Sequence, residues 1–123
     1  MILMYTSSGS LSCRKAKKYM KDNDIPYQER NIMREPLRES EIRYLLERSE
    51  NGTDDIISQR SKTIRESGAD VSSMRFSELV KFVLKHPDVL KRPIILDQKA
   101  LMSGYDEEEI SIFKPRTQQL QFI

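Results

Sequence analysis

The residues with the clearest chemical potential lie together near the start of the chain. Cys13 is the single cysteine of the sequence, and it stands at the end of the run Ser10-Leu11-Ser12-Cys13. If Ser10 caps a helix, Cys13 occupies the third helical position, where unpaired amides and the helix dipole favour a thiolate. Such a thiol could sense oxidants, forming a sulfenic acid or a mixed disulfide with a small thiol. The alternative is that Cys13 packs as a small apolar residue.

Other catalytic arrangements find little support. A single cysteine excludes a disulfide within the chain and a cysteine-rich zinc site. Ser10 has a structural role as a helix cap, and a catalytic serine would need a base. His86, the single histidine, precedes Pro87 at a predicted helix end, where a capping or solvent-facing role is ordinary. We therefore expect no catalytic residues, no metal and no cofactor.

Three basic residues are further candidates. The Arg92-Pro93 bond precedes an apolar run, where a cis peptide could bring the backbone close to the cysteine-bearing turn. Arg92 could then stabilise a thiolate or bind an oxyanion; alternatively it is a surface arginine. Arg60 and Lys62 form either a phosphate-binding pair or part of a solvated face.

The elements around the turn predict how these residues are held. Ile2–Thr6 is a strand, a helix follows Ser10 as far as about Asn23, and Tyr27–Ile32 is a second strand, parallel to the first. This order is how thioredoxin-like folds begin. Their turn normally holds Cys-x-x-Cys, whereas here the same spacing reads Ser-x-x-Cys.

The remainder predicts a helical block followed by a hairpin and a helix. The predicted elements are a helix over Arg38–Arg48 ending near a left-handed cap at Asn51-Gly52, a short helix capped by Thr53 and continuing toward Arg60-Ser61-Lys62, an amphipathic helix from Phe76 to His86, strands at Ile94–Asp97 and Ala100–Gly104, and a helix from Asp106 to Phe113. The fold class is thus α/β, a thioredoxin-like βαβ…ββα core with a helical insertion. We expect residues 1–35 and 88–123 to form the core and residues 36–87 the insertion, in one compact unit.

The composition limits the partners and the cellular location that we expect. The net charge is +2 with 33% charged residues, a balance that does not by itself argue for nucleic acid. No signal pattern or membrane-spanning run is present, so we expect a cytoplasmic protein without a membrane partner.

An ordered set of short motifs resembles one family along nearly the whole chain. The motifs are Tyr5-Thr6-Ser7, Ser12-Cys13-Arg14-Lys15-Ala16, Ile25-Pro26, Glu29-Arg30-Asn31-Ile32, Glu35-Pro36-Leu37, Gly52-Thr53-Asp54, Ile56-Ile57-Ser58, Arg60-Ser61-Lys62, His86-Pro87, Arg92-Pro93-Ile94-Ile95, Gly104-Tyr105 and Phe113-x-Pro115-Arg116. Together they resemble the Spx family of low-GC Gram-positive bacteria, transcription regulators on an arsenate-reductase-like fold.

The resemblance implies a regulator rather than an enzyme. It would bind the C-terminal domain of the RNA polymerase α subunit and redirect transcription under oxidative or thiol stress. In the family the region around Gly52 contacts α, and Glu47 and Arg48 fall in the α-contact helix. Arg60 and Lys62 match a basic pair near polymerase and promoter DNA, which is met only within the polymerase complex.

Arg92 matches the family arginine that responds to the oxidised switch. Ser10 replaces the first switch cysteine, Ser8-Gly9 replaces the usual Pro-Ser, and Glu47 stands where a basic residue is common. Family tails also direct members to an AAA+ protease and its adaptor, and here a shorter tail ends at Gln121-Phe122-Ile123.

Two other functions remain open. An arsenate-reductase-like or glutaredoxin-like thiol enzyme would need a nucleophilic sulfur where Ser10 stands, which disfavours it. A redox-independent polymerase-binding module, with Cys13 only packing, is the third reading.

Overall fold

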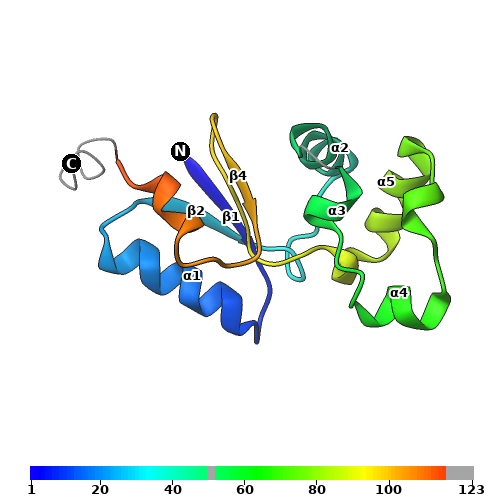
Figure 1. Ribbon diagram of the computed structural model, residues 1–123, viewed down its shortest axis with the longest axis horizontal. Coiled ribbons are helices and arrows are strands. Elements are labelled where there is room, and N and C mark those ends of the chain that lie inside the picture. The colour runs from blue at the N-terminus through cyan, green and yellow to red at the C-terminus, as the bar shows by residue number, and fades with distance from the viewer. Residues whose placement is uncertain (50–51, 116–123) are drawn as a thin grey trace. The chain divides into compact units, whose positions relative to one another are not determined.

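A computed structural model of the chain describes residues 1–49 and 52–115 (Figure 1). The chain divides into two compact units, Met1–Asn31 with Arg92–Ile123, and Ile32–Lys91. The insertion expected at residues 36–87 lies within the second unit. Arg116 and the tail Gln121–Ile123, like Asn51, lie outside the described residues.

The first unit is built on a four-stranded sheet. Its strands are β1 (Ile2–Thr6), β2 (Tyr27–Asn31), β3 (Ile94–Leu96) and β4 (Leu101–Ser103), in the order β2-β1-β3-β4. β1 is parallel to β2 and antiparallel to β3, and β3 pairs with β4 as a hairpin. These four strands and their pairing confirm the predicted βαβ and hairpin elements.

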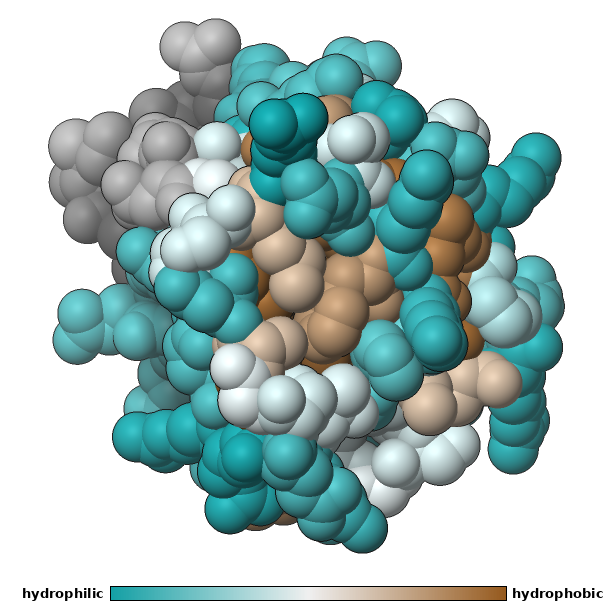
Figure 2. All heavy atoms as spheres, turned by 90° about the vertical axis from the view of Figure 1, so that its right-hand side faces the viewer, coloured by the Kyte–Doolittle hydropathy of each residue, from teal (hydrophilic) through white to brown (hydrophobic). Residues whose placement is uncertain are grey.

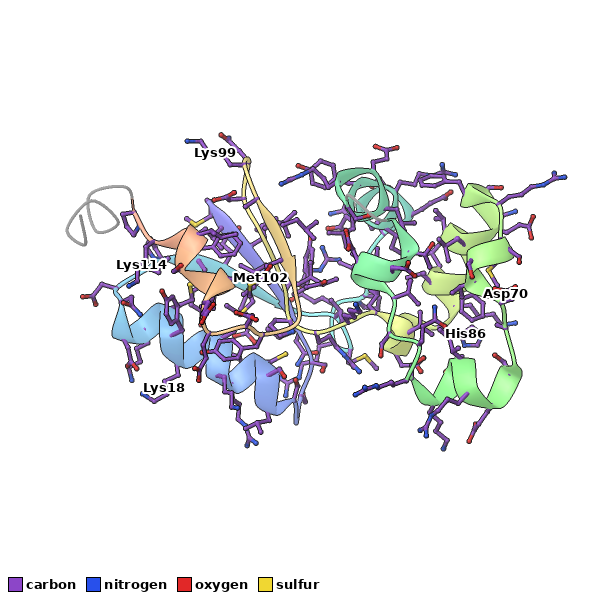
Figure 3. All side chains as sticks on the ribbon, in the orientation of Figure 1. Lys18, Asp70, His86, Lys99, Met102 and Lys114 are labelled. Carbon is purple, nitrogen blue, oxygen red and sulfur yellow. The ribbon has the colours of Figure 1, made fainter. Side chains whose placement is uncertain are left out.

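Helix α1 (Leu11–Asp22) packs on this sheet and forms the core of the first unit (Figure 1). The core residues come from β1, β3 and β4, from α1 and the segment just after it, and from the last described element; they are Met4, Ala16, Met20, Ile25, Ile95, Ile110, Phe113 and Met102, which is labelled in Figure 3. Because the spacing of Ala16 and Met20 is one helical turn, α1 presents a single apolar stripe to the sheet.

The last described element differs from the prediction. It is a 3-10 helix, η3 (Glu109–Phe113), and not an α-helix starting at Asp106. The Asp106 carboxylate accepts hydrogen bonds from the amides of Glu108 and Glu109, at 2.8 and 2.9 Å, and these bonds lower the pKa of Asp106. Ile110 and Phe113 are both buried, and a repeat of three residues per turn places them on one face.

The second unit is helical. Its elements are α2 (Glu39–Arg48), α3 (Thr53–Ile56), α4 (Lys62–Ser67), η1 (Val71–Ser73), α5 (Phe76–Lys85) and η2 (Pro87–Val89). Helices α2 and α5 confirm the predicted pair. The apolar face of α5 buries Leu79, Val80 and Val83, and its C-cap is His86, which is labelled in Figure 3.

The segment after Gly52 was predicted wrongly. The helix that begins at Thr53 lasts one turn, because Ile57 pairs with Leu90 in an isolated β-bridge. The Ser58 amide donates to the Val89 carbonyl at 2.7 Å, and the Lys91 amide to the Ile56 carbonyl at 2.8 Å. This pairing extends the backbone before Arg60, and the separate helix α4 was not predicted.

Gly52 also has a different role from the one expected. Helix α2 already ends at Arg48, with Ser49 as its C-cap, and Gly52 is the N-cap of α3, with Thr53 as the first helical residue rather than the cap. Its backbone, at φ 57° and ψ −119°, lies in a region that glycine adopts and other residues avoid.

None of the helices within residues 1–49 and 52–115 has the length and apolar character needed to cross a membrane.

Candidate functional site

The turn before α1 holds Cys13 inside the first unit. Ser10 caps the helix, and its Oγ accepts a hydrogen bond from the Cys13 amide at 3.2 Å. This confirms Cys13 as the third helical residue. The side chain is 1% exposed and its thiol is free. Cys13 therefore faces inward, on the side of α1 that also carries Ala16 and Met20.

A polar cluster that the sequence did not suggest lies one helical turn from Cys13. Glu29 of β2 accepts a hydrogen bond from the buried Thr6 hydroxyl at 2.8 Å, and its carboxylate lies 2.8 Å from Lys17 Nζ. The hydrogen bond with Glu29 raises the pKa of Lys17, although partial burial opposes the rise. The nearest lysine on the Cys13 face of α1 is thus engaged by a carboxylate. Glu29 pairs with Met4 in the parallel register of β1 and β2.

The pairing of β1 with β3 places the backbone of Arg92 near the turn that follows β1. The Arg92-Pro93 bond is cis, as the sequence suggested, and Tyr5 of β1 pairs with Ile94. One step further along these antiparallel strands, the Arg92-Pro93 backbone runs next to Thr6 and the start of the turn. Within the described part of the chain, no hydrogen bond or ion pair joins Arg92 to Ser10 or Cys13.

The second unit brings together the residues proposed to contact a partner. The Ser49 hydroxyl lies 2.9 Å from the Leu46 carbonyl and 3.2 Å from the Gly52 carbonyl, so it ties the end of α2 to the start of α3. Glu47 is exposed, and Arg48 donates a hydrogen bond to the Tyr44 hydroxyl at 2.8 Å. We define the α2–α3 surface as Tyr44, Glu47, Arg48 and Gly52.

Gly52 leaves this surface open. Apart from its chain neighbours, no atom of the described residues lies within 4 Å of the place where its Cβ would stand. Among these residues, the glycine is therefore required by its backbone conformation and not by crowding. A larger side chain there would project into the space in front of the surface.

Arg60 and Lys62 lie on either side of Ser61, the N-cap of α4, whose Oγ accepts from the Ile64 amide at 3.4 Å. Thr63 donates to Asp88 at 2.6 Å and Ile64 is buried, so these residues fix the inner side of α4. Both basic side chains are consequently exposed, and Lys62 lies 3.9 Å from Glu66. The two residues therefore flank the N-cap of α4.

The surface around α4 and α5 is mixed in character. Figure 2 looks onto the side of the molecule that carries these helices and shows apolar residues in the middle, bordered by hydrophilic ones. Two exposed apolar side chains of α5 are Phe76 and Leu84, at 41% and 40%. Asp70, which follows α4 and is labelled in Figure 3, accepts hydrogen bonds from the Ser72 and Ser73 hydroxyls, and these bonds lower its pKa.

Comparison with known proteins gives consistent results. The ArsC family model matches residues 5–113. The chain is 47% identical over 116 residues to the global transcriptional regulator Spx of Listeria innocua, covering 94% of this chain and 88% of that protein. It is 46% identical over 116 residues to Spx of Bacillus subtilis, with the same coverage, and 47% identical over 124 residues to Spx of Staphylococcus aureus, covering 98% and 95%.

Solved structures share the fold at low identity. An ArsC-family-related protein from Bacteroides fragilis superposes with a TM-score of 0.81 at 20% identity, covering 92% of this chain and 97% of that one. An arsenate reductase from Vibrio cholerae superposes with a TM-score of 0.71 at 12% identity, covering 91% and 93%. The arsenate-reductase-like α/β architecture is thereby confirmed, and the chain belongs to the ArsC family and, within it, to the Spx global transcriptional regulators.

Proposed function

We propose that this regulator acts by binding the C-terminal domain of the RNA polymerase α subunit through the α2–α3 surface. The observation that carries the proposal is the open Cβ position of Gly52, whose carbonyl is joined by the Ser49 hydroxyl to the end of the helix that carries Glu47 and Arg48. The high identity to Spx regulators supports it. A cytoplasmic location follows from a polymerase partner.

We further propose that the protein has no thiol-enzyme activity. A reductase of this fold needs a nucleophilic sulfur at the first position of the turn, and that position holds Ser10. Its Oγ serves as the helix cap, and the remaining thiol of Cys13 is 1% exposed. Neither side chain is placed to attack a substrate.

The burial of Cys13 favours the redox-independent form of the function. Reaction with an oxidant requires an accessible thiolate, and Lys17, one turn away, is paired with Glu29. In this form Arg92 and Cys13 set the packing around the turn and do not respond to oxidation. The alternative is the one-thiol sensor, in which oxidation of Cys13 changes binding.

A calorimetric titration of the α C-terminal domain separates these forms. We expect the same Kd for the reduced protein, for the peroxide-treated protein and for Cys13→Ala, which removes the sulfur without adding a buried hydroxyl. An affinity that changes on oxidation in the parent but not in Cys13→Ala would identify a sensor. No binding in any state would overturn the polymerase proposal.

Arg60 and Lys62 are proposed to contact DNA phosphates within the polymerase complex. The double variant Arg60→Gln/Lys62→Gln should leave binding to the α domain unchanged but weaken the complex of protein, α domain and promoter DNA. Loss of two phosphate contacts should reduce the slope of log K against log salt by about 1.8.

The matched control removes two charges elsewhere, from the exposed Lys15 and Lys21 of α1. Equal weakening in Lys15→Gln/Lys21→Gln, measured by mobility shift over a salt series, would show that net charge and not position matters.

The AAA+ protease and its adaptor remain proposed partners, through a tail that lies outside the described residues.

A further inference from the structure

The helix that follows Gly52 is too short to be stable by itself. Helix α3 has a single turn, and one isolated turn is unfavourable because several residues are fixed for one hydrogen bond. Its rear half is anchored, since Ile56 and Ile57 are buried. Residues 52–55 are half-buried or exposed, so apolar packing does little to hold the front half. The position of Gly52 therefore depends on hydrogen bonds.

One carbonyl of this turn lacks its ordinary partner. In a longer helix the Asp54 carbonyl would accept a hydrogen bond from the amide four residues later, that of Ser58. That amide donates instead to the Val89 carbonyl at 2.7 Å, in the backbone pairing that ends the helix. The Asp54 carbonyl is thus one of the acceptors that a helix end leaves without a partner from the helix itself.

Lys91 supplies the missing donor. Its Nζ donates to the Asp54 carbonyl at 2.7 Å, and its own amide donates to the Ile56 carbonyl at 2.8 Å. One residue therefore binds two carbonyls of α3, and its side chain reaches further toward the front of the helix than the backbone pairing does. A hydrogen bond from a charged donor is stronger than one between neutral groups. Leu90, the preceding residue, is 1% exposed and fixes the backbone from which the lysine side chain extends.

Gly52 is joined to the same turn. Its carbonyl accepts a hydrogen bond from the Asp55 amide at 3.2 Å, and the Ser49 hydroxyl lies 3.2 Å from the same carbonyl. The short segment is thus held at two points: the end of α2 contacts Gly52 through Ser49, and Lys91 contacts α3 through Asp54. Loss of the second contact would let the front half of α3 move, and Gly52 with it.

We infer that Lys91 is a positioning residue of the α2–α3 surface, which holds α3 and Gly52 in the arrangement that the partner binds. The inference rests on the proposed function, because the partner is taken to be the C-terminal domain of the polymerase α subunit. Lys91 acts within the chain and need not contact this partner. If α3 leaves the arrangement for part of the time, the Kd rises as the binding-competent fraction falls.

The first test is calorimetric titration of the α domain with the parent and two variants. Lys91→Met keeps an unbranched side chain without a donor, so binding should weaken by about three- to tenfold, the effect of one lost hydrogen bond. Lys91→Arg can donate to the same carbonyl, and its Kd should stay within about twofold of the parent value. The matched control is Lys81→Met, which makes the same change of charge at an exposed position of α5 and should bind like the parent.

Amide hydrogen exchange of the free protein separates positioning from direct contact. The amides of Asp55 and Ile57 donate to carbonyls at the start of this turn. In Lys91→Met they should exchange about three- to tenfold faster, because α3 opens more often, while the amides of α5 keep their parent rates. A lysine that only touched the partner would leave exchange in the free protein unchanged.

The outcomes separate the two proposals. If the parent binds and Lys91→Met binds equally well, the inference about Lys91 is overturned and the polymerase proposal stands. Weaker binding of Lys91→Met with unchanged exchange in α3 would also overturn the inference, as would equal weakening in Lys81→Met. If the parent does not bind the α domain, both proposals are overturned.

Discussion

The Gly52→Arg variant is expected to lose binding to the polymerase α C-terminal domain by about a hundredfold or more, the scale of a dominant interface residue. The Ser49 hydroxyl, at the end of α2, lies 3.2 Å from the Gly52 carbonyl, and no described residue other than the chain neighbour of Gly52 comes within 4 Å of its Cβ position. An arginine side chain would fill that space and keep the partner from approaching the α2–α3 surface. Calorimetric titration gives the Kd of parent and variant.

Backbone strain is the competing cause, and Gly52→Ala separates it from bulk. At φ 57° and ψ −119°, any side chain with a Cβ is strained, by about 1–3 kcal/mol. Alanine and arginine therefore share the strain and differ in size. We expect similar losses of stability for both variants but near-parent binding for alanine. Equal loss of binding in both would assign the effect to the altered start of α3, and normal binding in both would remove Gly52 from the interface.

Local signals predicted the first unit well. The Ser10 cap, the apolar stripe of α1 and the apolar runs of β1 and β3 are each readable within a few residues. The parallel pairing of β1 and β2 also follows from the connection through a single helix. The cysteine position in the helix was predictable for the same reason, because it depends only on the cap.

Long-range pairing explains what was missed in the second unit. The helix that starts at Thr53 ends because Ile57 meets Leu90, a residue far away in the sequence. Asp54 and Asp55 in its first turn signal a helix start but say nothing about its end. The predicted role of Gly52, as the cap that ends α2, was wrong for the same reason, because Gly52 is the cap that begins α3.

The properties of the candidate site depend on which side chains are buried and which pair with one another. Only some of these contacts join residues close enough in the sequence to be predicted from it. That Cys13 is 1% exposed depends on how α1 packs on the sheet. The Thr6–Glu29–Lys17 cluster joins three elements and has no local pattern. The Tyr44–Arg48 pair, in contrast, has the i, i+4 spacing of interacting helix residues, and a search for such pairs would have found it.

A row of buried side chains across the sheet, on which α1 packs, predicts a second large effect, on the stability of the fold. Met4, Ile95 and Met102 are paired across β1, β3 and β4, so their side chains share the face of the sheet that belongs to the core with Ala16 and Met20. Ile95 is at the centre of the row and is 0% exposed. It cannot be shortened without opening a cavity between the sheet and α1.

We expect Ile95→Ala to lower the free energy of unfolding by about 2–5 kcal/mol, from the lost apolar contact and the remaining cavity. Proteins of this size have about 5–15 kcal/mol in total, so the variant would lose a large share of it. Ile95→Val should cost about 0.5–1.5 kcal/mol, because most of the volume is kept. Urea unfolding measures both, with Ile112→Ala, exposed at 48%, as a control that should change little. If Ile95→Ala were no more damaging than Ile112→Ala, the sheet would not be packed on α1 through this row, and the inward position of Cys13 on the same helix would lose its structural basis.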